Sequence, residues 1–522
     1  MSREDTGRLA IFPVLPNRFK TGKSNMKRLL KYLALSFVGL IALTIISFYI
    51  LLSKSLPDLP KLNQPTSSLA ISNVTVINPI DSTIVSHQTV LIENGRIISV
   101  DDTGSNTLAE SVTNIDGNGK FLIPGFWDMH SHLRHQYEPY LSMPLFIANG
   151  VFNIRDMGTD VSNQQNNQWR RQILAGELMG PRVMGQVSAI IGRLRSKADA
   201  DAIIADLDYK KNEFIKITNA PLRDPFFRLL EQARKKGITL AGHKPRSVKA
   251  LDAVNAGMKS MEHARYFLFE SFPGAPEFRE RYQAYYSGQD TGGAIYTTEA
   301  RRAMIDKHDP AMFYELVNAM VENETWFCPT HITRRFDAYV DNDAFRNDLR
   351  LKYINKFEQF KWNLDAGGMI DRDPTELGRK TYMDFYKKGL ELTGKAHQAG
   401  LAILTGTDAN DSYCFPGFSI HDELEELVKA GLSPMDALVT ATVNPAIYFE
   451  VLADYGSIET GKIADMILLD TNPLYDISNT SKINAVIFNG VLYSRSDLDK
   501  WLSFVEDNAA SWSIALKVMW EG

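Results

Sequence analysis

Eight short apolar segments recur along the middle of the chain, and most of them are followed by a stretch with helical patterning. Regular alternation of short buried strands with amphipathic helices is typical of a parallel sheet closed into a barrel. We therefore predict an α/β fold with a (β/α)₈ TIM-type barrel over residues 121–449. The predicted strands are 121–129, 150–156, 182–189, 213–217, 238–242, 259–263, 326–330 and 401–406.

Two further β-rich segments flank the predicted barrel. Residues 69–120 alternate apolar and polar side chains and contain Asn94-Gly95, a dipeptide that favours a tight hairpin turn. Residues 450–498 repeat the pattern, with an Asn-Gly turn of their own. We predict that the two segments pair into one small discontinuous β-sandwich domain. Residues 499–522 are amphipathic and are expected to form a helical tail, packed on the domain or on a second subunit of a homo-oligomer.

The N-terminal region contains an uncharged apolar run. Residues 32–53 carry no charged side chain, and a helix needs ~20 such residues to cross the hydrocarbon core of a bilayer. Six basic residues lie between Arg18 and Lys31, just before the run, and only Lys54 follows it closely, a bias that places the N-terminus in the cytoplasm and the catalytic domain on the extracytoplasmic side. A cleavable signal peptide beginning at Met26 is the open alternative. The expected order is a cytoplasmic basic segment (1–31), a transmembrane signal anchor (32–53) and a linker (54–68).

The amino-acid composition limits the partners that the chain can bind and the kinds of metal site that it can form. The net charge is −5, and no Lys/Arg-rich block occurs beyond the region before the apolar run, so a nucleic-acid partner is not expected. Cys328 and Cys414 are the two cysteines. Two cysteines exclude a Cys-based zinc site, and they leave one disulfide open in an oxidising compartment.

Polar residues with metal-ligand chemistry stand where predicted strands end. His130 and His132 close the first strand, and alternation along a strand lets both side chains face the same side. His243, His263 and Asp408 follow three other strands. The carboxyl ends of all strands in a barrel face one opening, so residues remote in sequence converge there. This placement predicts a metal site built from nitrogen and oxygen donors.

Lys216 lies within the apolar strand 213–217. Burial of an ammonium is costly and favours the neutral amine. One interpretation is a lysine that extends its amine to the surface or pairs with a nearby carboxylate. The other uses the chemistry of a neutral amine, which adds CO₂ to form a carbamate, an anionic group able to bridge two cations. Beside four histidines and an aspartate, the bridging role is favoured.

At this point the chain resembles a known family. It is similar to the metal-dependent amidohydrolase superfamily over about residues 70–495, in the style of its imidazolonepropionase-like and prolidase-like branch. The segment QVSAIIGRLR lacks the Gly-Gly-His found in parts of that branch, which puts substrate binding there in doubt. The matching motifs, in strand order, are LIPGFWDMHSHL, NEFIKI, AGHKP, SMEHA and LTGTDA.

The resemblance implies a pair of divalent ions, most often zinc, that supply a bridging hydroxide and polarise the scissile carbonyl. Manganese, cobalt or iron would also suit such a donor set. Asp408 would take the proton of the hydroxide and pass it to the leaving group. The implied ligands are His130, His132 and Asp408 for one ion, His243 and His263 for the other, and carboxylated Lys216 as the bridge.

Several reactions fit this chemistry. Hydrolysis of an amide or peptide bond in a small substrate, such as a dipeptide or N-acyl amino acid, is the preferred function. Lactone, ester or phosphotriester hydrolysis is the alternative on the same site. A deaminase is disfavoured, because its mononuclear members typically place a glutamate where this chain has Arg246. A non-catalytic, membrane-tethered binding protein is disfavoured by the intact ligand set.

Cations near the strand ends suggest the substrate's charge. Arg155, Lys244, Arg265 and His331 are the predicted substrate contacts, and the arginines could hold a free carboxylate by paired hydrogen bonds. Alternatively, these are ordinary exposed charges or are paired with Asp156, Glu262 and Asp337. Asp128 is interpreted as a residue that supports the barrel end, not as a ligand.

Overall fold

The computed structural model describes most of the chain and divides it into two compact units after Leu56. We describe each unit by itself. The described residues are 22–63, 68–105, 107–158, 161–210, 213–290 and 294–521.

The first unit contains one long helix, α1 (Gly22–Ser53). Its segment Met26–Ser53 has a mean hydropathy of 2.5 and buries none of its residues, so it is a candidate membrane span. A signal sequence has the same length and composition, and both interpretations of the N-terminus stay open. Most of the predicted cytoplasmic segment, residues 1–21, lies outside the described residues.

The second unit is built around a parallel sheet. Seven strands of the described chain form it in sequence order, each hydrogen-bonded to the next along the chain. This confirms the prediction of a mixed α/β fold with a TIM-like barrel. The strands are β6 (Phe126–Ser131), β7 (Val151–Asp156), β8 (Arg182–Ile191), β9 (Glu213–Ile217), β10 (Thr239–Gly242), β11 (Ser260–Glu262) and β12 (Trp326–Cys328).

The predicted eighth strand is present only as an irregular segment that closes the ring. Isolated parallel bridges join Ile403 to Phe327 on β12 and Ala409 to Ser131 on β6. The barrel is therefore nearly closed, with seven regular strands within the described residues instead of the predicted eight. The positive φ of 59° at Asp408 interrupts extended backbone between the two bridges, at Ile403 and Ala409.

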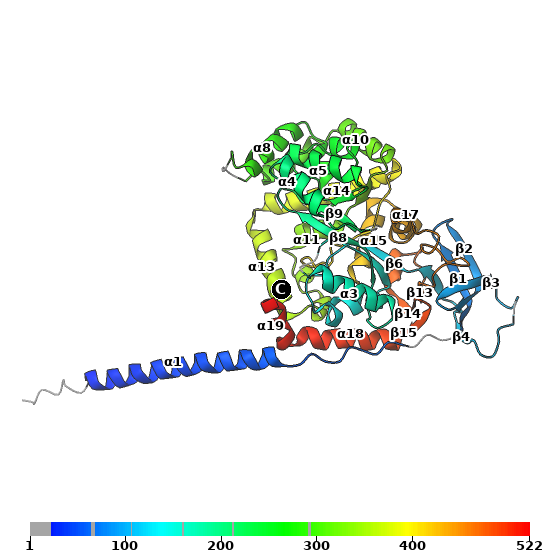
Figure 1. The fold of residues 1–522 in the computed structure, drawn as a ribbon, viewed down its shortest axis with the longest axis horizontal. Coiled ribbons are helices and arrows are strands. Elements are labelled where there is room, and N and C mark those ends of the chain that lie inside the picture. Colours follow the sequence, from blue (N-terminus) through cyan, green and yellow to red (C-terminus); the bar gives the residue numbers. More distant parts are fainter. Residues whose placement is uncertain are drawn as a thin grey trace, which may run out of the picture. The chain divides into compact units, whose positions relative to one another are not determined.

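Helices follow the strands and cover the outside of the barrel (Figure 1). In α5, the apolar side chains Phe226, Leu229, Leu230 and Ala233 are buried, which is the spacing of one helical face packed on the sheet. The helices after β6 to β10 are α2 (Ser142–Ala148), preceded by the 3₁₀ turn η1 (Glu138–Tyr140), then α3 (Asn163–Leu174), α4 (Lys197–Asp206), α5 (Arg223–Lys235) and α6 (Ala250–Asn255).

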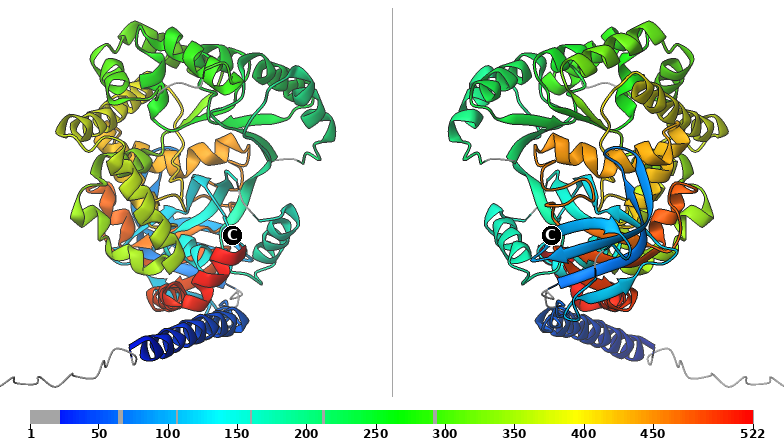
Figure 2. Two further views of the ribbon diagram at one scale, coloured as in Figure 1. Left: turned by 90° about the vertical axis from the view of Figure 1, so that its left-hand side faces the viewer. Right: turned by 90° about the vertical axis from the view of Figure 1, so that its right-hand side faces the viewer.

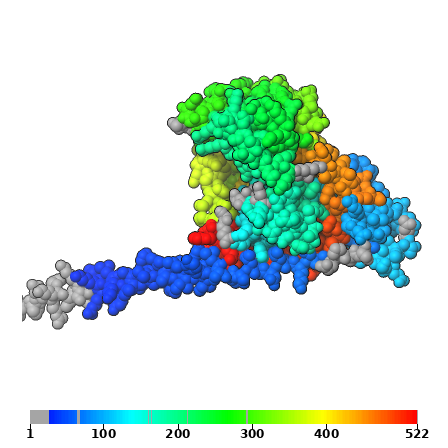
Figure 3. Space-filling model, viewed as in Figure 1, coloured from blue at the N-terminus to red at the C-terminus, as the bar shows by residue number. Residues whose placement is uncertain are grey.

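The connections after β11 and β12 are long and helical. The first belongs to a continuous lobe, green in Figures 2 and 3. It contains α7 (Arg265–Glu270), α8 (Ala275–Ser287), α9 (Thr298–Asp306) and α10 (Pro310–Glu322). The second contains α11 (His331–Tyr339), α12 (Asp343–Arg346), η2 (Leu349–Tyr353), α13 (Lys356–Asp371) and α14 (Glu376–Gln398).

The two flanking β-rich segments join in one eight-stranded sheet, here called the composite sheet. Its central joint is the antiparallel pairing of β5 (Phe121–Pro124) with β13 (Met466–Leu469). The predicted sandwich is wrong in form, because within the described residues these strands belong to a single sheet. The other strands are β1 (Ser68–Asn78), β2 (Thr83–Glu93), β3 (Arg96–Asp102), β4 (Thr113–Asp116), β14 (Ile483–Phe488) and β15 (Val491–Ser494).

The first predicted strand, 121–129, is in fact two strands in two different sheets. The break falls at Gly125, where a Cβ atom would lie 2.0 Å from the Phe152 ring. Only glycine permits this approach, so the chain can leave the composite sheet and enter the barrel here.

The remaining helices complete the second unit. In α18, Leu498, Trp501 and Val505 are buried, so the C-terminal region packs on the catalytic unit. These elements are α15 (Ser419–Ala430), α16 (Pro434–Ala441), α17 (Val443–Tyr448), η3 (Ile477–Ser481), α18 (Arg495–Ala510) and α19 (Trp512–Glu521).

Candidate metal centre

The strand-end residues predicted as ligands converge at the carboxyl end of the barrel. Nε2 of His132 lies 3.0 Å, and Nε2 of His130 3.3 Å, from Oδ1 of Asp408. The three side chains offer donor atoms that all lie within 4.8 Å of one another. Two nitrogens and a carboxylate oxygen at this spacing form a donor set for a divalent cation.

The second pair of histidines extends the same cluster. Nε2 of His243 and Nε2 of His263 are 2.8 Å apart. Nδ1 of His263 lies 3.8 Å from Oδ2 of Asp408, and its ring centroid lies 5.0 Å from that of His130. All five predicted residues with imidazole or carboxylate side chains are therefore gathered in one group.

Neighbouring groups fix the orientation of the histidine rings. Nδ1 of His130 lies 3.0 Å from Oε2 of Glu262, Nδ1 of His132 lies 2.8 Å from the carbonyl of Gly158, and Nδ1 of His263 lies 2.7 Å from Oγ1 of Thr330. With Nδ1 engaged, each ring presents Nε2 to the cluster. This arrangement of outer partners is typical of histidines that bind metals.

Lys216 lies on β9 with 7% of its surface exposed. Its amine has no hydrogen bond or ion pair among the described residues, so the predicted alternative of a carboxylate-paired lysine is not observed. Burial lowers the pKa of Lys216, although the charges of Asp408 and Glu262 oppose the shift. A buried amine with a lowered pKa is the form that reacts as a nucleophile.

The protonation states of the cluster suit cation binding. Burial, followed by the charge of Lys216, lowers the pKa of His132 to about 4, and burial together with Arg265 holds the pKa of His243 well below its ordinary value. Burial alone would raise the pKa of Asp408, but His130 and His132 bring it well below the usual range. Neutral imidazoles at His132 and His243 and an ionised carboxylate at Asp408 are states that ligate metals, whereas Asp408 and Glu262 raise the pKa of His130 against the effect of burial.

Asp128 supports the end of the barrel. Its Oδ1 accepts hydrogen bonds from the backbone N–H groups of His130, at 3.1 Å, and Thr407, at 3.0 Å. These bonds tie β6 to the closing segment next to Asp408. Burial raises the pKa of Asp128 to about 6. Its contacts agree with the interpretation of Asp128 as a supporting residue.

Residues 121–493 match the family model described as the amidohydrolase family. The chain belongs to this family. The family is named for the hydrolysis of amide-type carbon–nitrogen bonds. The match covers the barrel and the composite sheet strands that follow it, and it contains every predicted ligand.

Two curated relatives match the amidohydrolase over short stretches. An imidazolonepropionase from Symbiobacterium thermophilum is 33% identical over 75 residues, which cover 14% of this chain and 17% of the relative. An adenine deaminase from Desulforamulus reducens is 36% identical over 88 residues, which cover 17% of this chain and 14% of the relative. The chain thus spans less than a fifth of the length of either.

Solved structures match far more of the amidohydrolase. A putative prolidase from Bifidobacterium longum shares 21% identity with a TM-score of 0.55, covering 85% of this chain and 100% of that one. Bottromycin amidohydrolase shares 18% identity with a TM-score of 0.60, covering 86% of this chain and 91% of that one. At these identities the likeness establishes the shared fold.

The predicted substrate contacts of the amidohydrolase need correction at two positions. Arg155 is fully buried inside the barrel, where Nη2 lies 2.8 Å from Oε1 of Glu262. Lys244 is buried as well, with Nζ 2.8 Å from Oε1 of Glu270. Both cations are neutralised by internal carboxylates and do not line the opening. The sequence placed them at strand ends but did not reveal which way they point.

His331 and Arg265 differ from these two. His331 begins α11 and is fully buried, and burial lowers its pKa to about 3. Neither ring nitrogen has a hydrogen bond among the described residues, and its role in substrate binding stays a prediction. Arg265 is partly buried and has no carboxylate partner in the described chain, as developed below.

Glu262 was named in the sequence analysis only as a possible partner of the strand-end cations, and its contact with the ligand cluster was missed. It contacts both His130 and Arg155, and so links the ligand cluster to the barrel interior. Burial alone would raise its pKa, but Arg155 and His130 lower the pKa of Glu262 to about 2. Its position directly before His263 in the SMEHA motif was the available signal.

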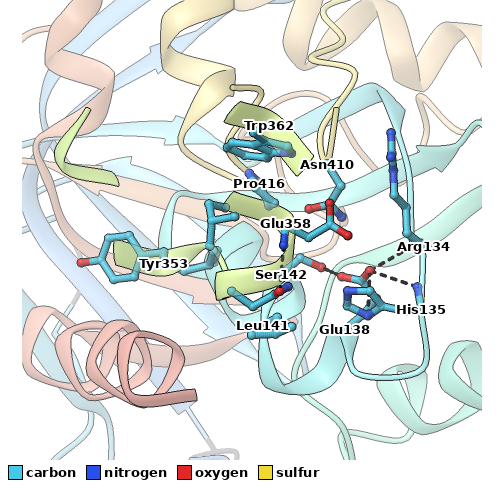
Figure 4. Close-up of a pocket in the computed structure, with 13 residues that line it drawn as sticks. Arg134, His135, Glu138, Leu141, Ser142, Tyr353, Glu358, Trp362, Asn410 and Pro416 are labelled. Carbon is cyan, nitrogen blue, oxygen red and sulfur yellow. Dashed lines mark hydrogen bonds and ion pairs between the residues drawn. The ribbon is translucent and has the colours of Figure 1, made fainter. Parts of the chain in front are cut away.

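The two cysteines of the amidohydrolase are both free and buried, so the disulfide left open by the sequence is not formed. A small cavity of ≈ 20 Å³ lies beside the loop that follows β6 (Figure 4). Glu138 there accepts hydrogen bonds from the backbone of Arg134, at 2.9 Å, and of His135, at 3.3 Å. These contacts hold the loop that carries His132, and the cavity is too small for a substrate.

Proposed function

We propose that this amidohydrolase binds two divalent cations and hydrolyses an amide or peptide bond in a small substrate, such as a dipeptide or N-acyl amino acid. His130, His132 and Asp408 would hold one ion, and His243 and His263 the other. The observation that carries the proposal is the convergence of these five side chains, from four separate parts of the barrel, with Nε2 atoms directed to one region.

Lys216 would complete the site as a carbamate. Its neutral Nζ would attack CO₂, form an N–C bond and release one proton, leaving an anionic group with two oxygen donors. The unpaired, buried amine supports this assignment, because an ammonium in the same place would lack a counterion within hydrogen-bonding distance. The charge of Lys216 also lowers the pKa of His132 and His243, so the side chain lies near both halves of the cluster.

Zinc is the ion that we expect in the native protein, since all six proposed ligands offer nitrogen or oxygen. Bound divalent cations would supply hydroxide near neutral pH and polarise the carbonyl of the substrate.

Asp408 is the proposed acid–base residue. Its side chain is 11% exposed, so the carboxylate can meet solvent or substrate. His130 and His132 lower its pKa and keep it ionised. In this role Oδ2 would accept a proton and return it to the leaving nitrogen. Asp128 and Glu262 would orient the cluster through His130.

Residues 32–53 would anchor the enzyme as an uncleaved signal anchor, with the catalytic unit on the extracytoplasmic side. The uncharged run 32–53 within helix α1 and the basic residues before this run support the arrangement.

Replacement of Lys216 tests the metal centre. In Lys216→Ala we expect fewer bound ions than about two per chain by elemental analysis, and a rate several orders of magnitude lower. Short carboxylic acids should restore part of the rate by filling the bridging position. Lys259→Ala is the matched control, because Lys259 precedes β11 at the opposite end of the barrel.

A second readout follows the carbamate itself. Protein equilibrated with ¹³C-bicarbonate should give one carbamate resonance that is absent from Lys216→Ala and present in the Lys259 control. Metal content and activity of the wild-type level in Lys216→Ala would contradict the bridging role. A panel of dipeptides, N-acyl amino acids, lactones and esters separates amide hydrolysis from the alternative reactions.

A further inference from the structure

The loop after β10 and the connections after β11 and β12 line a cavity of ≈ 740 Å³. Its size is in the range of small-molecule binding sites. Tyrosines supply much of its wall, and Arg246, which follows the proposed ligand His243 by three residues, also lines it. The tyrosines are Tyr282, Tyr285, Tyr286, Tyr296 and Tyr382.

Arg246 is a mostly buried cation held by aromatic rings. Its Nη1 donates a hydrogen bond of 2.6 Å to the hydroxyl of Tyr282, and its guanidinium carbon lies 4.9 Å from the Tyr282 ring and 5.7 Å from the Tyr296 ring. Nε has no hydrogen bond among the described residues. No carboxylate of the described chain lies within 4.0 Å of this guanidinium. Cation–π contacts orient it and leave its charge without a counterion.

Arg265 begins α7 and carries a second guanidinium close to the ligand cluster. It follows His263 by two residues, and its charge lowers the pKa of both His243 and His263. Its Nε is buried and also lacks a hydrogen bond within the described chain. Burial lowers the pKa of Arg265, and the charges of Arg334 and then Arg246 lower it further. Two guanidinium groups thus lie close enough to repel each other.

Several cations beside the pair have carboxylate partners. Lys244 and Arg279 share the carboxylate of Glu270, at 2.8 and 3.0 Å, and Arg334 pairs with Asp337. Within the described residues Arg246 and Arg265 form no ion pair, and neither do Arg301 and Arg372, which line the same cavity as Arg246. Buried like charges without counterions are costly unless a ligand neutralises them.

We propose that Arg246 and Arg265 bind a carboxylate of the substrate, and that the tyrosine wall contacts the apolar part attached to it. The inference rests on the proposed amide hydrolysis and defines its substrate class as acids with an apolar or aromatic group. Guanidinium groups recognise carboxylates through parallel hydrogen bonds. Tyrosine rings offer both apolar surface and hydroxyl groups to such a ligand. A carboxylate held at Arg265 leaves the rest of the molecule next to the histidines.

Binding of matched probes without a hydrolysable bond tests the carboxylate site directly. The probes are 3-phenylpropanoate and 3-phenylpropan-1-ol, titrated by calorimetry into the full-length, metal-loaded protein in detergent. We expect the acid to bind wild type at least tenfold more tightly than the alcohol, the factor that corresponds to ~1.4 kcal/mol. Arg246→Gln and Arg265→Gln should each reduce the preference below threefold, and Arg246→Lys and Arg265→Lys should give intermediate values.

Arg281→Gln is the matched control, because Arg281 is an exposed arginine of the same connection. It should keep the wild-type preference. A preference for the acid that survives both glutamine substitutions would place the carboxylate elsewhere, on the metal donors for example, and would overturn the proposal. Unchanged thermal unfolding of each variant separates loss of the binding site from loss of the fold.

Kinetics provide the second arm. Wild type should cleave dipeptides with at least tenfold higher kcat/KM than their C-terminal amides, and Arg265→Gln should remove this difference by slowing the dipeptides alone. Equal slowing of both substrates would refute a carboxylate contact. If no amide is hydrolysed while the probe preference follows the two arginines, the proposed reaction fails and the carboxylate site stands.

Discussion

Replacing Arg155 by methionine would leave Glu262 as a buried carboxylate without its counterion. Both side chains are 0% exposed, and Nη2 of Arg155 lies 2.8 Å from Oε1 of Glu262. Removing one partner of such a pair costs ~3–5 kcal/mol, because the remaining charge cannot be solvated. Arg155 also donates to the Met129 carbonyl, at 2.6 Å, and to Ser260 Oγ, at 2.9 Å. The loss is a large part of a typical free energy of unfolding of ~5–15 kcal/mol.

The measurement is urea-induced unfolding of the full-length protein in detergent, followed by tryptophan fluorescence. Arg155→Met should lower the free energy of unfolding by ~3–5 kcal/mol, whereas the exposed control Arg281→Met should change it by less than ~0.5 kcal/mol. Adding Glu262→Gln to Arg155→Met should recover part of the loss, since the second change removes the uncompensated charge. This recovery distinguishes a buried ion pair from a simple packing defect.

An opposite outcome would restore the original assignment of Arg155. If Arg155→Met unfolds at the wild-type urea concentration and only lowers kcat/KM, the guanidinium contacts substrate, and the internal ion pair with Glu262 contributes nothing to stability. The same experiment therefore decides between the two roles that sequence and structure suggest.

Three further outcomes follow from the described contacts. Removal of residues 1–54 should give a soluble, active enzyme, because the hydrogen bond from Asn63 to the Leu492 carbonyl, at 2.8 Å, is kept. A fragment that folds but lacks metal or turnover would contradict this prediction. Burial lowers the pKa of His421 to about 4, so the unfolded chain binds the extra proton first, and this residue should contribute a loss of about 3 kcal/mol of stability as pH falls from 6.5 to 4. His421→Gln should lose correspondingly less over this range in urea titrations. Chelation should lower the unfolding temperature, and zinc at a hundred times its Kd should restore ~2.7 kcal/mol; an unchanged melting curve would argue against ions held by the folded cluster.

Strand positions and ligand convergence followed from the sequence because both depend on local patterns. The apolar run of β9 was bounded as predicted, at Glu213–Ile217, and the geometry of a parallel barrel then placed Lys216 and the strand-end histidines near one opening. The pattern of apolar residues and the topology of a parallel barrel were enough to predict where these residues lie.

Features that depend on contacts between distant segments were not predictable in this way. The break at Gly125 arises from its close approach to Phe152. The buried state of Arg155 depends on a carboxylate more than a hundred residues away. Arg246 lies in a loop with no periodic pattern, and its tyrosine contacts come from the connection after β11. Such residues acquire their roles only when the helices around the cavity are in place.

The composite sheet has a consequence for biosynthesis. Strand β5 precedes the barrel in the chain, but its antiparallel partner β13 begins only at Met466. Throughout synthesis of the barrel, the edge of β5 that will meet β13 has unpaired N–H and C=O groups, and such an edge readily pairs with other chains. A nascent chain that terminates early anywhere in the barrel therefore carries an open edge beside apolar residues. The last strands to be synthesised cover this edge. Until they are made, the unfinished chain is a substrate for chaperones and proteases.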